Sequence, residues 1–282
     1  MENFFKNFVC KSKERVGAKV DRFNNAGKAK VYLIADFDRT ITPLLNENGE
    51  EISTWALLSR KLPEDIRNAE IELYKKYRPL EVAGKMTAED AFEWWSVNLD
   101  YYERSELSWS DLSLEVREAI PARSGAIELF NVCEDKKIPT VILSAGIKDV
   151  IELWCEKFRV RPNMILSTKL NFDDRGFICG WDKDSLVHTL NKNETGKKHL
   201  RAIQETRPYA ILVGDSMDDA AMVDGDENIL RIFIDNGHDK ENRNNEFYDK
   251  VFENFDLIVK NGSLLPIVET IKSIMGQNEK RF

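Results

Sequence analysis

Five short apolar runs, separated by segments of helical period, constrain the fold of this chain more than any other feature. The runs are rich in β-branched residues and nearly continuous in apolar character. Such runs are typical of strands buried in a parallel sheet, because helices cover both faces of that sheet. The alternation therefore predicts an α/β fold with an open, doubly wound, Rossmann-like parallel sheet. The predicted strands are Val31–Asp36, Ile138–Ser144, Tyr209–Asp215, Ile229–Ile234 and Asp256–Val259.

Helical patterns occupy the segments between these strands. Ser124 is a candidate N-cap for a helix that runs to about Asp135, and a second helix is predicted to follow Gly146. The same period recurs from Leu264 to Ile274. The segment Leu170–Trp181 is typical of a β-hairpin, because Asp-Asp-Arg-Gly separates two apolar stretches.

The segment 43–122 breaks the alternation, since it contains several helix-like stretches and no clear strand. Its best helix is Thr87–Arg104, where Thr87 and Asp90 form a candidate capping box. An unstructured loop of this length is uncommon in a compact domain. We therefore expect residues 43–122 to form a helical cap domain inserted into a core made of residues 1–42 and 123–282.

Charge and composition narrow the possible partners. The net charge is -8, and an acidic chain repels nucleic-acid backbones and anionic membranes, so neither is an expected partner. No apolar run approaches the roughly 18 residues that a membrane helix needs, and the first residues lack the pattern of a signal peptide. The mildly basic stretch Lys11–Lys30 is expected to be a solvated leader helix rather than a membrane-surface segment.

The cysteines and histidines give no sign of a disulfide framework or a zinc site. The four cysteines contain no Cys-x-x-Cys pair, and the three histidines are scattered. This usage is typical of reduced thiols inside a cell. We expect a cytoplasmic protein that is a monomer or a weak homodimer.

Two carboxylates follow the first predicted strand. Asp36 and Asp38 are separated by one residue, so both can face the crevice beyond the carboxyl end of the strand, where open α/β sheets bind ligands. One carboxylate can attack phosphorus, and the other can protonate a leaving oxygen. Both are oxygen ligands suited to a hard divalent cation. Taken alone, the pair is equally typical of a turn or a helix cap.

Two further strand ends carry polar groups. Ser144, Ala145 and Gly146 combine a hydroxyl with backbone N–H groups at a predicted helix start, which is a candidate anion site or an ordinary cap. Asp215 and Asp219 would face the same way if a helical turn follows the strand, and they suit Mg²⁺. A lysine of the stretch 191–198 could clamp a phosphate.

This order of motifs resembles the haloacid dehalogenase superfamily of phosphohydrolases. Asp36-x-Asp38 resembles its first motif, Ser144 its second, a lysine its third, and Gly214-Asp215-Ser216-x-x-Asp219 its fourth. The resemblance implies that Asp36 is the nucleophile and Asp38 the acid and base. It also implies that Mg²⁺ is held by Asp36, the carbonyl group of Asp38, and Asp215, supported by Asp219.

A narrower resemblance extends over roughly Gly27 to Gly225, to the cytosolic 5′-nucleotidase III, or pyrimidine 5′-nucleotidase, family. The stretches that carry it are 73–81, 143–147, 171–173 and 187–192. It implies Lys192 as the phosphate clamp, with Lys197 the second choice from spacing. It implies Glu81 in nucleotide recognition, with Trp94 and Trp95 as an aromatic pair of which one faces the ligand.

The chain departs from the family pattern at two positions near the motifs. Arg39 replaces an apolar residue, and Asp218 replaces a glycine. The residues predict a Mg²⁺-dependent phosphohydrolase with a phospho-aspartate intermediate, and the resemblance implies a nucleoside 5′-monophosphate as substrate, with pyrimidines favoured. The alternatives are another small phosphate monoester, phosphate transfer to a nucleoside, and a binding protein without activity.

Overall fold

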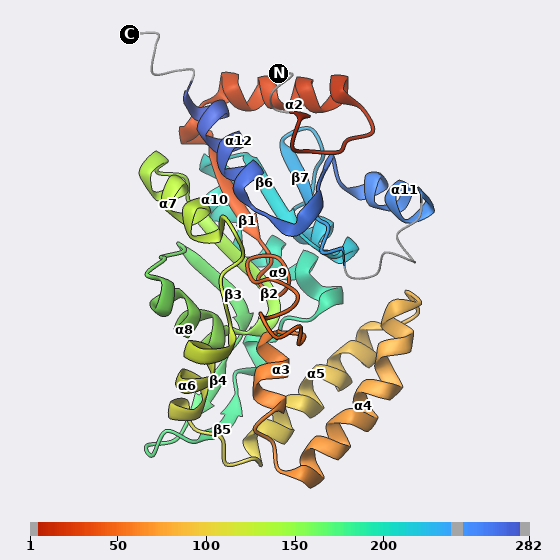
Figure 1. The fold of residues 1–282 in the computed structure, drawn as a ribbon, viewed down its shortest axis with the longest axis vertical. Helices are drawn as coiled ribbons and strands as arrows, with labels where there is room; N and C mark the ends of the chain where they lie inside the picture. Colours follow the sequence, from red (N-terminus) through yellow and green to blue (C-terminus); the bar gives the residue numbers. More distant parts are fainter. Residues whose placement is uncertain (1–4, 238–244, 277–282) are drawn as a thin grey trace.

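A computed structural model describes residues 5–237 and 245–276. Its centre is a sheet of six strands in the order β3-β2-β1-β6-β7-β8, in which every neighbouring pair is parallel (Figure 1). This order, with the first strand in the middle, is the doubly wound arrangement that the sequence predicts. The strands are β1 (Val31–Ala35), β2 (Thr140–Ile147), β3 (Met164–Thr168), β6 (Tyr209–Gly214), β7 (Ile229–Ile234) and β8 (Leu257–Val259).

All five predicted strands are present, with ends that differ by up to three residues, and the sequence analysis missed β3. This strand lies at the edge of the sheet, and three of its five residues are only half buried. Its apolar signal is correspondingly short, since it lacks the continuous apolar run of the fully buried strands.

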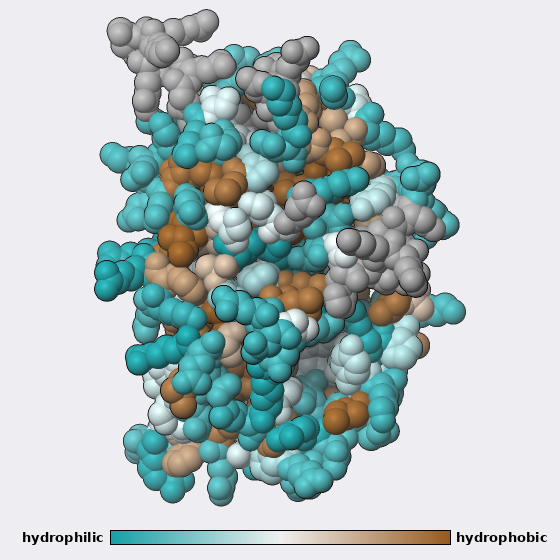
Figure 2. Space-filling view, in the orientation of Figure 1, coloured by the Kyte–Doolittle hydropathy of each residue, from teal (hydrophilic) through white to brown (hydrophobic). Residues whose placement is uncertain are grey.

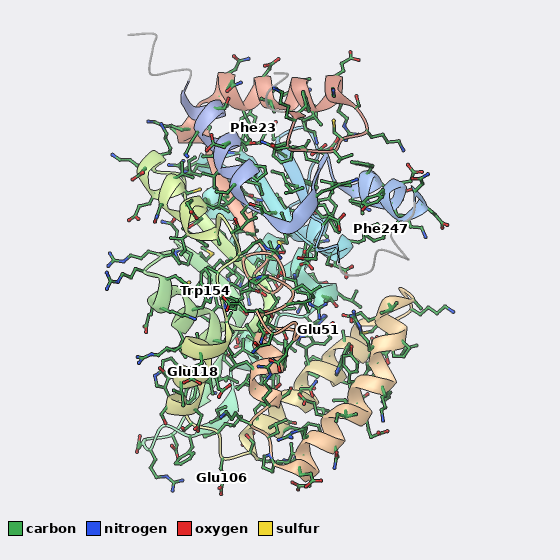
Figure 3. All side chains as sticks on the ribbon, viewed as in Figure 1. Phe23, Glu51, Glu106, Glu118, Trp154 and Phe247 are labelled. Carbon is green, nitrogen blue, oxygen red and sulfur yellow. The ribbon has the colours of Figure 1, made fainter. Side chains whose placement is uncertain are left out.

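Successive residues of β1 point to opposite faces of the sheet, as in any strand. Leu33 and Ala35 join one hydrophobic cluster, whereas Tyr32 and Ile34 join the other. Helices cover both faces, and the side chains of Trp154 and Phe247 in Figure 3 belong to the helices on the two faces. The first face is covered by α7 (Ala126–Lys136), α8 (Lys148–Phe158) and α12 (Leu265–Gly276), and the second by α9 (Lys192–His199), α10 (Arg201–Thr206) and α11 (Asn245–Asn254).

The segment between β1 and β2 is helical, as predicted. It contains α3 (Thr54–Ser59), α4 (Glu64–Val82), α5 (Ala88–Glu103) and α6 (Trp109–Ala119), and α3 to α5 lie beyond the carboxyl ends of the strands (Figure 1). The predicted capping box of Thr87 and Asp90 begins α5. Tyr77, Met86, Ala91, Trp94 and Trp95 form a small hydrophobic cluster between α4 and α5.

The predicted hairpin is also present and joins this helical layer. It consists of β4 (Leu170–Phe172) and β5 (Ile178–Trp181), and Gly176 in its turn has a positive φ of 83°. β5 packs against α5, and Nε1 of Trp181 donates a hydrogen bond of 3.2 Å to Asp100.

The basic leader is a helix, α2 (Lys13–Ala26), but it is not freely solvated as expected. It lies across the amino ends of the strands (Figure 1), and one face is buried through Val16, Lys19, Val20 and Phe23. The apolar members of that face repeat at helical spacing, which explains why the helix docks. The view in Figure 2 is largely hydrophilic, and no helix among the described residues is long and apolar enough to cross a membrane.

Candidate active site

The candidate site forms where β1, β2 and β6 end side by side. Because parallel strands end at one edge, residues distant in the sequence meet there. Asp36 follows β1, and its backbone N–H donates to the carbonyl oxygen of Val213 on β6 at 3.0 Å. Asp215 directly follows β6.

Three carboxylates converge at this edge. Asp36, Asp215 and Asp219 each offer an oxygen within 4.8 Å of the others. The backbone N–H groups of Asp215 and Ser216 both donate to Oδ2 of Asp219 at 3.0 Å, which fixes that carboxylate beneath the turn. A Cβ atom on Gly214 would lie 2.3 Å from Cβ of Asp219, so only glycine fits there. The predicted helical turn is a 3-10 helix, Met217–Met222.

Lys192 lies between two of these carboxylates. Its Nζ is 2.8 Å from Oδ1 of Asp36 and 2.6 Å from Oδ1 of Asp219, and the lysine is buried. It begins α9, which approaches the 3-10 helix closely at Gly196. A Cβ atom on Gly196 would lie 2.2 Å from the carbonyl oxygen of Met222. Glycine at this position therefore lets α9 deliver the amine to the site.

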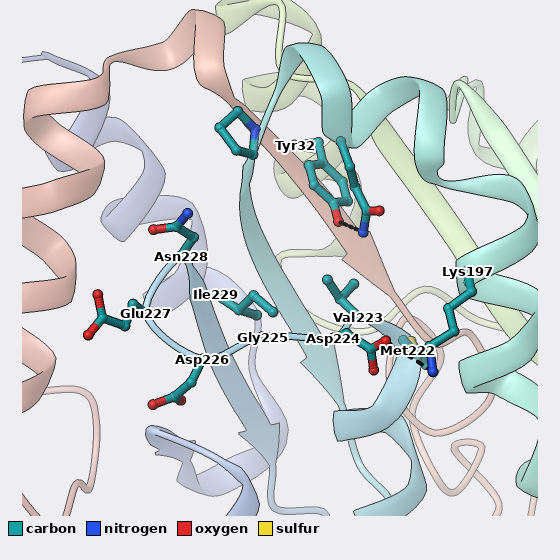
Figure 4. Close-up of a pocket in the computed structure, with 13 residues that line it drawn as sticks. Tyr32, Lys197, Met222, Val223, Asp224, Gly225, Asp226, Glu227, Asn228 and Ile229 are labelled. Carbon is teal, nitrogen blue, oxygen red and sulfur yellow. Dashed lines mark hydrogen bonds and ion pairs between the residues drawn. The ribbon is translucent and has the colours of Figure 1, made fainter.

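Lys197, the second choice from spacing, lies elsewhere. It pairs with Asp224 at 3.1 Å, and both side chains are more than half exposed. It lines a separate cavity of about 480 Å³ whose wall also includes Tyr32 and Ile229 (Figure 4). Asp36, Asp215 and Asp219 do not line this cavity.

Asp38 is held by Thr54, a residue that the sequence analysis did not single out. The backbone N–H of Thr54 donates to Oδ1 of Asp38 at 2.9 Å, and its hydroxyl donates to Oδ2 at 2.7 Å. A Cβ atom on Gly146 would come within 2.4 Å of the Thr54 hydroxyl and 2.9 Å of Asp38. Thr54 is the first residue of α3, so the inserted segment supplies the group that orients this carboxylate.

Ser144, Ala145 and Gly146 lie within β2, whose pairing with β3 is irregular at this point. The Ser144 side chain is buried, and its Oγ accepts a hydrogen bond of 3.2 Å from the N–H of Gly146. We expected these residues at a helix start. The helix α8 begins only at Lys148, so their N–H groups belong to an irregular strand end instead.

Trp94 and Trp95 contact each other with ring centroids 4.9 Å apart, but their further partners differ, as adjacent helical residues point in different directions. Nε1 of Trp95 donates to the carbonyl oxygen of Ala145 at 3.0 Å, which places this ring beside Ser144. Trp94 stacks on Tyr77 with ring centroids 5.8 Å apart, inside the cluster between α4 and α5. Trp95 is therefore the member of the pair that reaches the site.

Glu81 lies on α4 and forms an ion pair with Arg78. Burial and Asp219 raise the pKa of Asp218, which follows β6, and the charge of Glu81 adds to this shift. The negative charge of Glu81 therefore acts on the acidic edge of the sheet from the inserted helices.

The electrostatics of the site reflect an excess of buried negative charge. Burial, Asp219 and Asp215 raise the pKa of Asp36, although Lys192 opposes them. Burial and Asp219 likewise raise the pKa of Asp215. Although burial lowers it, the pKa of Lys192 is raised overall by Asp219 and Asp36. Converging oxygen ligands with surplus negative charge fit a hard cation such as Mg²⁺.

Three residues that the sequence analysis missed complete the site. The Thr40 hydroxyl donates to Oδ1 of Asp215 at 3.0 Å, and Nδ2 of Asn236 donates to Oδ2 at 3.3 Å. Arg123, a buried residue, donates to Asn236 and to three backbone carbonyl oxygens after β1. No local pattern marks these residues, since each acts on a partner from another strand end.

Comparisons with known proteins agree with this geometry. Residues 39–275 match the family described as pyrimidine 5′-nucleotidase (UMPH-1). The chain is 30% identical over 268 residues to the 7-methylguanosine phosphate-specific 5′-nucleotidase A of Xenopus laevis, covering 90% of each chain. It is 30% identical over 273 residues to the 7-methylguanosine phosphate-specific 5′-nucleotidase of Gallus gallus, covering 92% of each chain.

Solved structures give the same relationship. The structure of cytosolic 5′-nucleotidase IIIB bound to cytidine has a TM-score of 0.80 and 25% identity, and the match covers 98% of this chain and 96% of that one. A substrate complex of phosphoserine phosphatase has a TM-score of 0.57 at 15% identity, covering 85% of this chain and 97% of that one. The latter match shows a shared fold, that of the haloacid dehalogenase-type phosphatases.

Proposed function

Because this chain belongs to the pyrimidine 5′-nucleotidase family and is a phosphate-monoester hydrolase of that type, we propose that it converts nucleoside 5′-monophosphates to nucleoside and phosphate. We propose pyrimidine nucleotides as the favoured substrates and a phospho-aspartate on Asp36 as the intermediate. The observation that carries the proposal is the contact of Asp36 with Lys192 beside two further carboxylates, the half-buried Asp215 and the buried Asp219.

Asp36 is the proposed nucleophile. A carboxylate oxygen can attack phosphorus and form an acyl phosphate, which divides a slow hydrolysis into two easier steps. Lys192 holds Oδ1 of Asp36 at 2.8 Å, so the orientation of the carboxylate is fixed before substrate arrives. The same ammonium group is placed to neutralise a phosphoryl oxygen during transfer.

Asp38 is the proposed acid and base. Burial raises the pKa of Asp38, although the hydrogen bonds from Thr54 oppose this shift. The raised pKa favours the protonated carboxyl group that a general acid needs. As the bond to the ester oxygen breaks, Asp38 gives its proton to that oxygen. In the second step Asp38 takes a proton from water, the water oxygen bonds to phosphorus, and the Asp36 carboxylate leaves.

Asp36, Asp215 and Asp219 would hold Mg²⁺, together with the backbone carbonyl of Asp38. When bound, this ion supplies positive charge against the phosphoryl oxygens. The Ser144 hydroxyl and the N–H groups of Ala145 and Gly146 are the proposed hydrogen-bond donors to the same oxygens.

Helices α3 to α6 are proposed to act as a cap that selects the leaving group. Trp95 beside Ala145 offers an aromatic face for a base, and Glu81 offers an acceptor. A second candidate substrate is 7-methylguanosine 5′-monophosphate, for which the relatives above are named. Glu81 and Asp218 favour it, because N7-methylation gives the base a positive charge that carboxylates and aromatic faces attract. We further propose a cytoplasmic location and a monomer or weak homodimer.

The deciding experiment measures phosphate release from a panel of nucleoside monophosphates and sugar phosphates. Wild type and Asp36→Asn are compared with Mg²⁺ and with EDTA. We expect Mg²⁺-dependent release from CMP, UMP or 7-methyl-GMP that disappears in Asp36→Asn. Release that survives in Asp36→Asn would refute the assigned nucleophile, whereas preference for a sugar phosphate would refute the substrate. Labelled nucleoside monophosphate formed from CMP and an added labelled nucleoside would indicate phosphate transfer instead.

A further inference from the structure

Arg123 is a buried guanidinium group whose hydrogen-bond partners are neutral oxygens. It is 5% exposed and donates through Nε to the carbonyl of Thr40 at 2.6 Å and through Nη1 to that of Gly262 at 2.6 Å. Nη2 donates to the carbonyls of Arg39 and Thr42 and to the Asn236 side chain. Burial lowers the pKa of Arg123 to about 10, and Asp215 opposes this shift.

Three of these acceptors belong to the loop that follows the Asp36–Asp38 pair. Within this loop Arg39 has a φ of 62°, in the left-handed region that residues other than glycine rarely adopt. Such a conformation persists only where the surroundings impose it. The Arg39 carbonyl accepts hydrogen bonds from both Arg123 and Nδ2 of Asn236, the latter at 3.0 Å. These two donors hold the Arg39 carbonyl from outside the loop, while the N–H of Arg39 donates to the Thr42 hydroxyl at 3.1 Å within it.

Asn236 extends the same network to the carboxylates. Its Oδ1 accepts from Arg123 at 2.6 Å, which orients the amide so that Nδ2 faces Oδ2 of Asp215 at 3.3 Å. The other oxygen of Asp215 accepts from the hydroxyl of Thr40, whose carbonyl Arg123 also holds. Both oxygens of Asp215 are thus oriented by residues that Arg123 fixes.

The fold reserves space for this guanidinium group. Gly262 has a φ of 60°, and a Cβ atom there would lie 2.5 Å from Nη1 of Arg123. Arg123 precedes α7, Gly262 precedes α12, and these two helices pack side by side (Figure 1). The backbone N–H of Arg123 also donates to the carbonyl of Ile41 at 3.1 Å. Arg123 therefore joins the two chain segments that lead into and out of the inserted helices.

We propose that Arg123 is a positioning residue that sets the geometry of the metal-binding carboxylates, acting on Asp215 through Asn236 and on the loop after Asp36 through its carbonyl groups. This inference rests on the proposed function. Arg123 itself contacts neither the substrate position nor the reacting atoms. Partners behind a metal ligand typically change metal affinity or activity by about 10–100-fold when they are removed.

The test is Mg²⁺ binding measured by titration calorimetry, beside kcat and KM for the best nucleotide. Arg123→Lys keeps the charge but cannot reach several carbonyl groups with a fixed planar fork. We expect the Mg²⁺ dissociation constant to rise about tenfold and kcat to fall by a similar factor, with KM little changed. Asn236→Ala should shift the Mg²⁺ affinity in the same direction by less, since it leaves the carbonyl contacts of Arg123 intact.

Arg207→Lys is the matched control. Arg207 also clamps carbonyl groups, those of Lys28 and Val31 at 3.0 and 2.9 Å, but at the amino edge of the sheet. The Arg207→Lys substitution should lower the melting temperature without changing Mg²⁺ affinity. Added guanidinium chloride, at concentrations that do not unfold the protein, should restore Mg²⁺ affinity to Arg123→Ala and leave the affinity of Arg207→Ala at the wild-type value.

The outcomes separate this inference from the proposed function. If Arg123→Lys and Asn236→Ala both bind Mg²⁺ as wild type does, Arg123 is merely structural and the inference is overturned. If Arg123→Lys fails to fold, unchanged Mg²⁺ affinity in Asn236→Ala overturns it. Should wild type bind Mg²⁺ but hydrolyse no nucleotide, the proposed function fails, while the binding measurements still decide the role of Arg123.

Discussion

The two edges of the parallel sheet each bury a lysine between carboxylates, but they balance charge differently. At the amino edge, Nζ of Lys19 is 2.7 Å from Asp256 and 3.1 Å from Asp226, and it also donates to the carbonyl of Ile229. At the carboxyl edge, Nζ of Lys192 contacts Asp36 and Asp219 at similar distances. Both lysines are nearly inaccessible to solvent.

The difference lies in what surrounds each lysine. Asp226 at the amino edge also pairs with Arg15 at 2.8 Å, and Arg231 lies 3.7 Å from it, so three cations offset the two carboxylates there. At the carboxyl edge a third carboxylate, the half-buried Asp215, receives side-chain hydrogen bonds from neutral groups alone among the described residues. A balanced buried cluster joins elements together, whereas an unbalanced one has residual affinity for a cation and a phosphate.

The largest expected effect comes from removing the lysine at the unbalanced edge. Lys192→Met should lower kcat by about 10³-fold at saturating Mg²⁺, since one preorganised electrostatic contact is typically worth that much. The measurement is steady-state phosphate release on the best nucleotide, with circular dichroism to verify folding. A folded Lys192→Met protein with normal kcat would mean that this lysine is structural, like Lys19.

The next effect in size concerns the lysine at the balanced edge. Lys19→Met should destabilise the fold by about 3 kcal/mol, because it leaves Asp256 buried without its partner. Urea unfolding monitored by tryptophan fluorescence measures this, and kcat at a temperature where the protein stays folded should not change. A fall in kcat with unchanged unfolding free energy would contradict the assignment of stability to the amino edge and of activity to the carboxyl edge.

Metal and pH should distinguish the edges further. Burial and neighbouring carboxylates raise the pKa of Asp36 and Asp215 in the folded protein, above about 3.9 in the unfolded chain. Between the two pKa values the folded state binds more protons than the unfolded state, so the unfolding free energy of metal-free protein falls as pH rises through this window. Mg²⁺ needs deprotonated ligands, so its stabilising effect should grow over the same range.

The measurement is urea unfolding at about pH 5 and about pH 8, with EDTA and with Mg²⁺. The increase in unfolding free energy that Mg²⁺ produces should be larger at the higher pH by about 2 kcal/mol, since each unit of pKa shift corresponds to ~1.4 kcal/mol. Asp36→Asn removes one of the raised groups and should reduce the pH dependence. An increment that does not vary with pH would show that these carboxylates are already ionised in the metal-free protein.

Local patterns allowed much of the fold to be predicted, and long-range contacts explain what was missed. The runs that contain β1, β2, β6, β7 and β8 are visible because burial on both faces excludes polar residues. Asp36 and Asp215 could be nominated because each directly follows such a run. Thr54, Asn236 and Arg123 could not, since their partners lie on other segments and their residue types are ordinary in loops.

The choice between two lysines of α9 marks the limit of sequence spacing. Both Lys192 and Lys197 were candidates for the phosphate clamp, and the resemblance to the nucleotidase family favoured the first. The structure brings Lys192 to Asp36, because the helix begins at that residue and Gly196 lets it approach Met222. The position of a helix start relative to a neighbouring strand end depends on packing, which spacing alone does not specify.

The smallest expected effect tests that distinction within one helix. Lys197→Ala removes an exposed pair with Asp224, which should change the unfolding free energy by no more than about 0.5 kcal/mol. Because Lys197 lines the cavity in Figure 4 and contacts no carboxylate of the site, kcat and Mg²⁺ affinity should stay at the wild-type values. Both are measured in the assays used for Lys192→Met. A large loss of kcat in Lys197→Ala would mean that α9 rotates in the working enzyme. Lys197 would then replace Lys192 as the phosphate clamp.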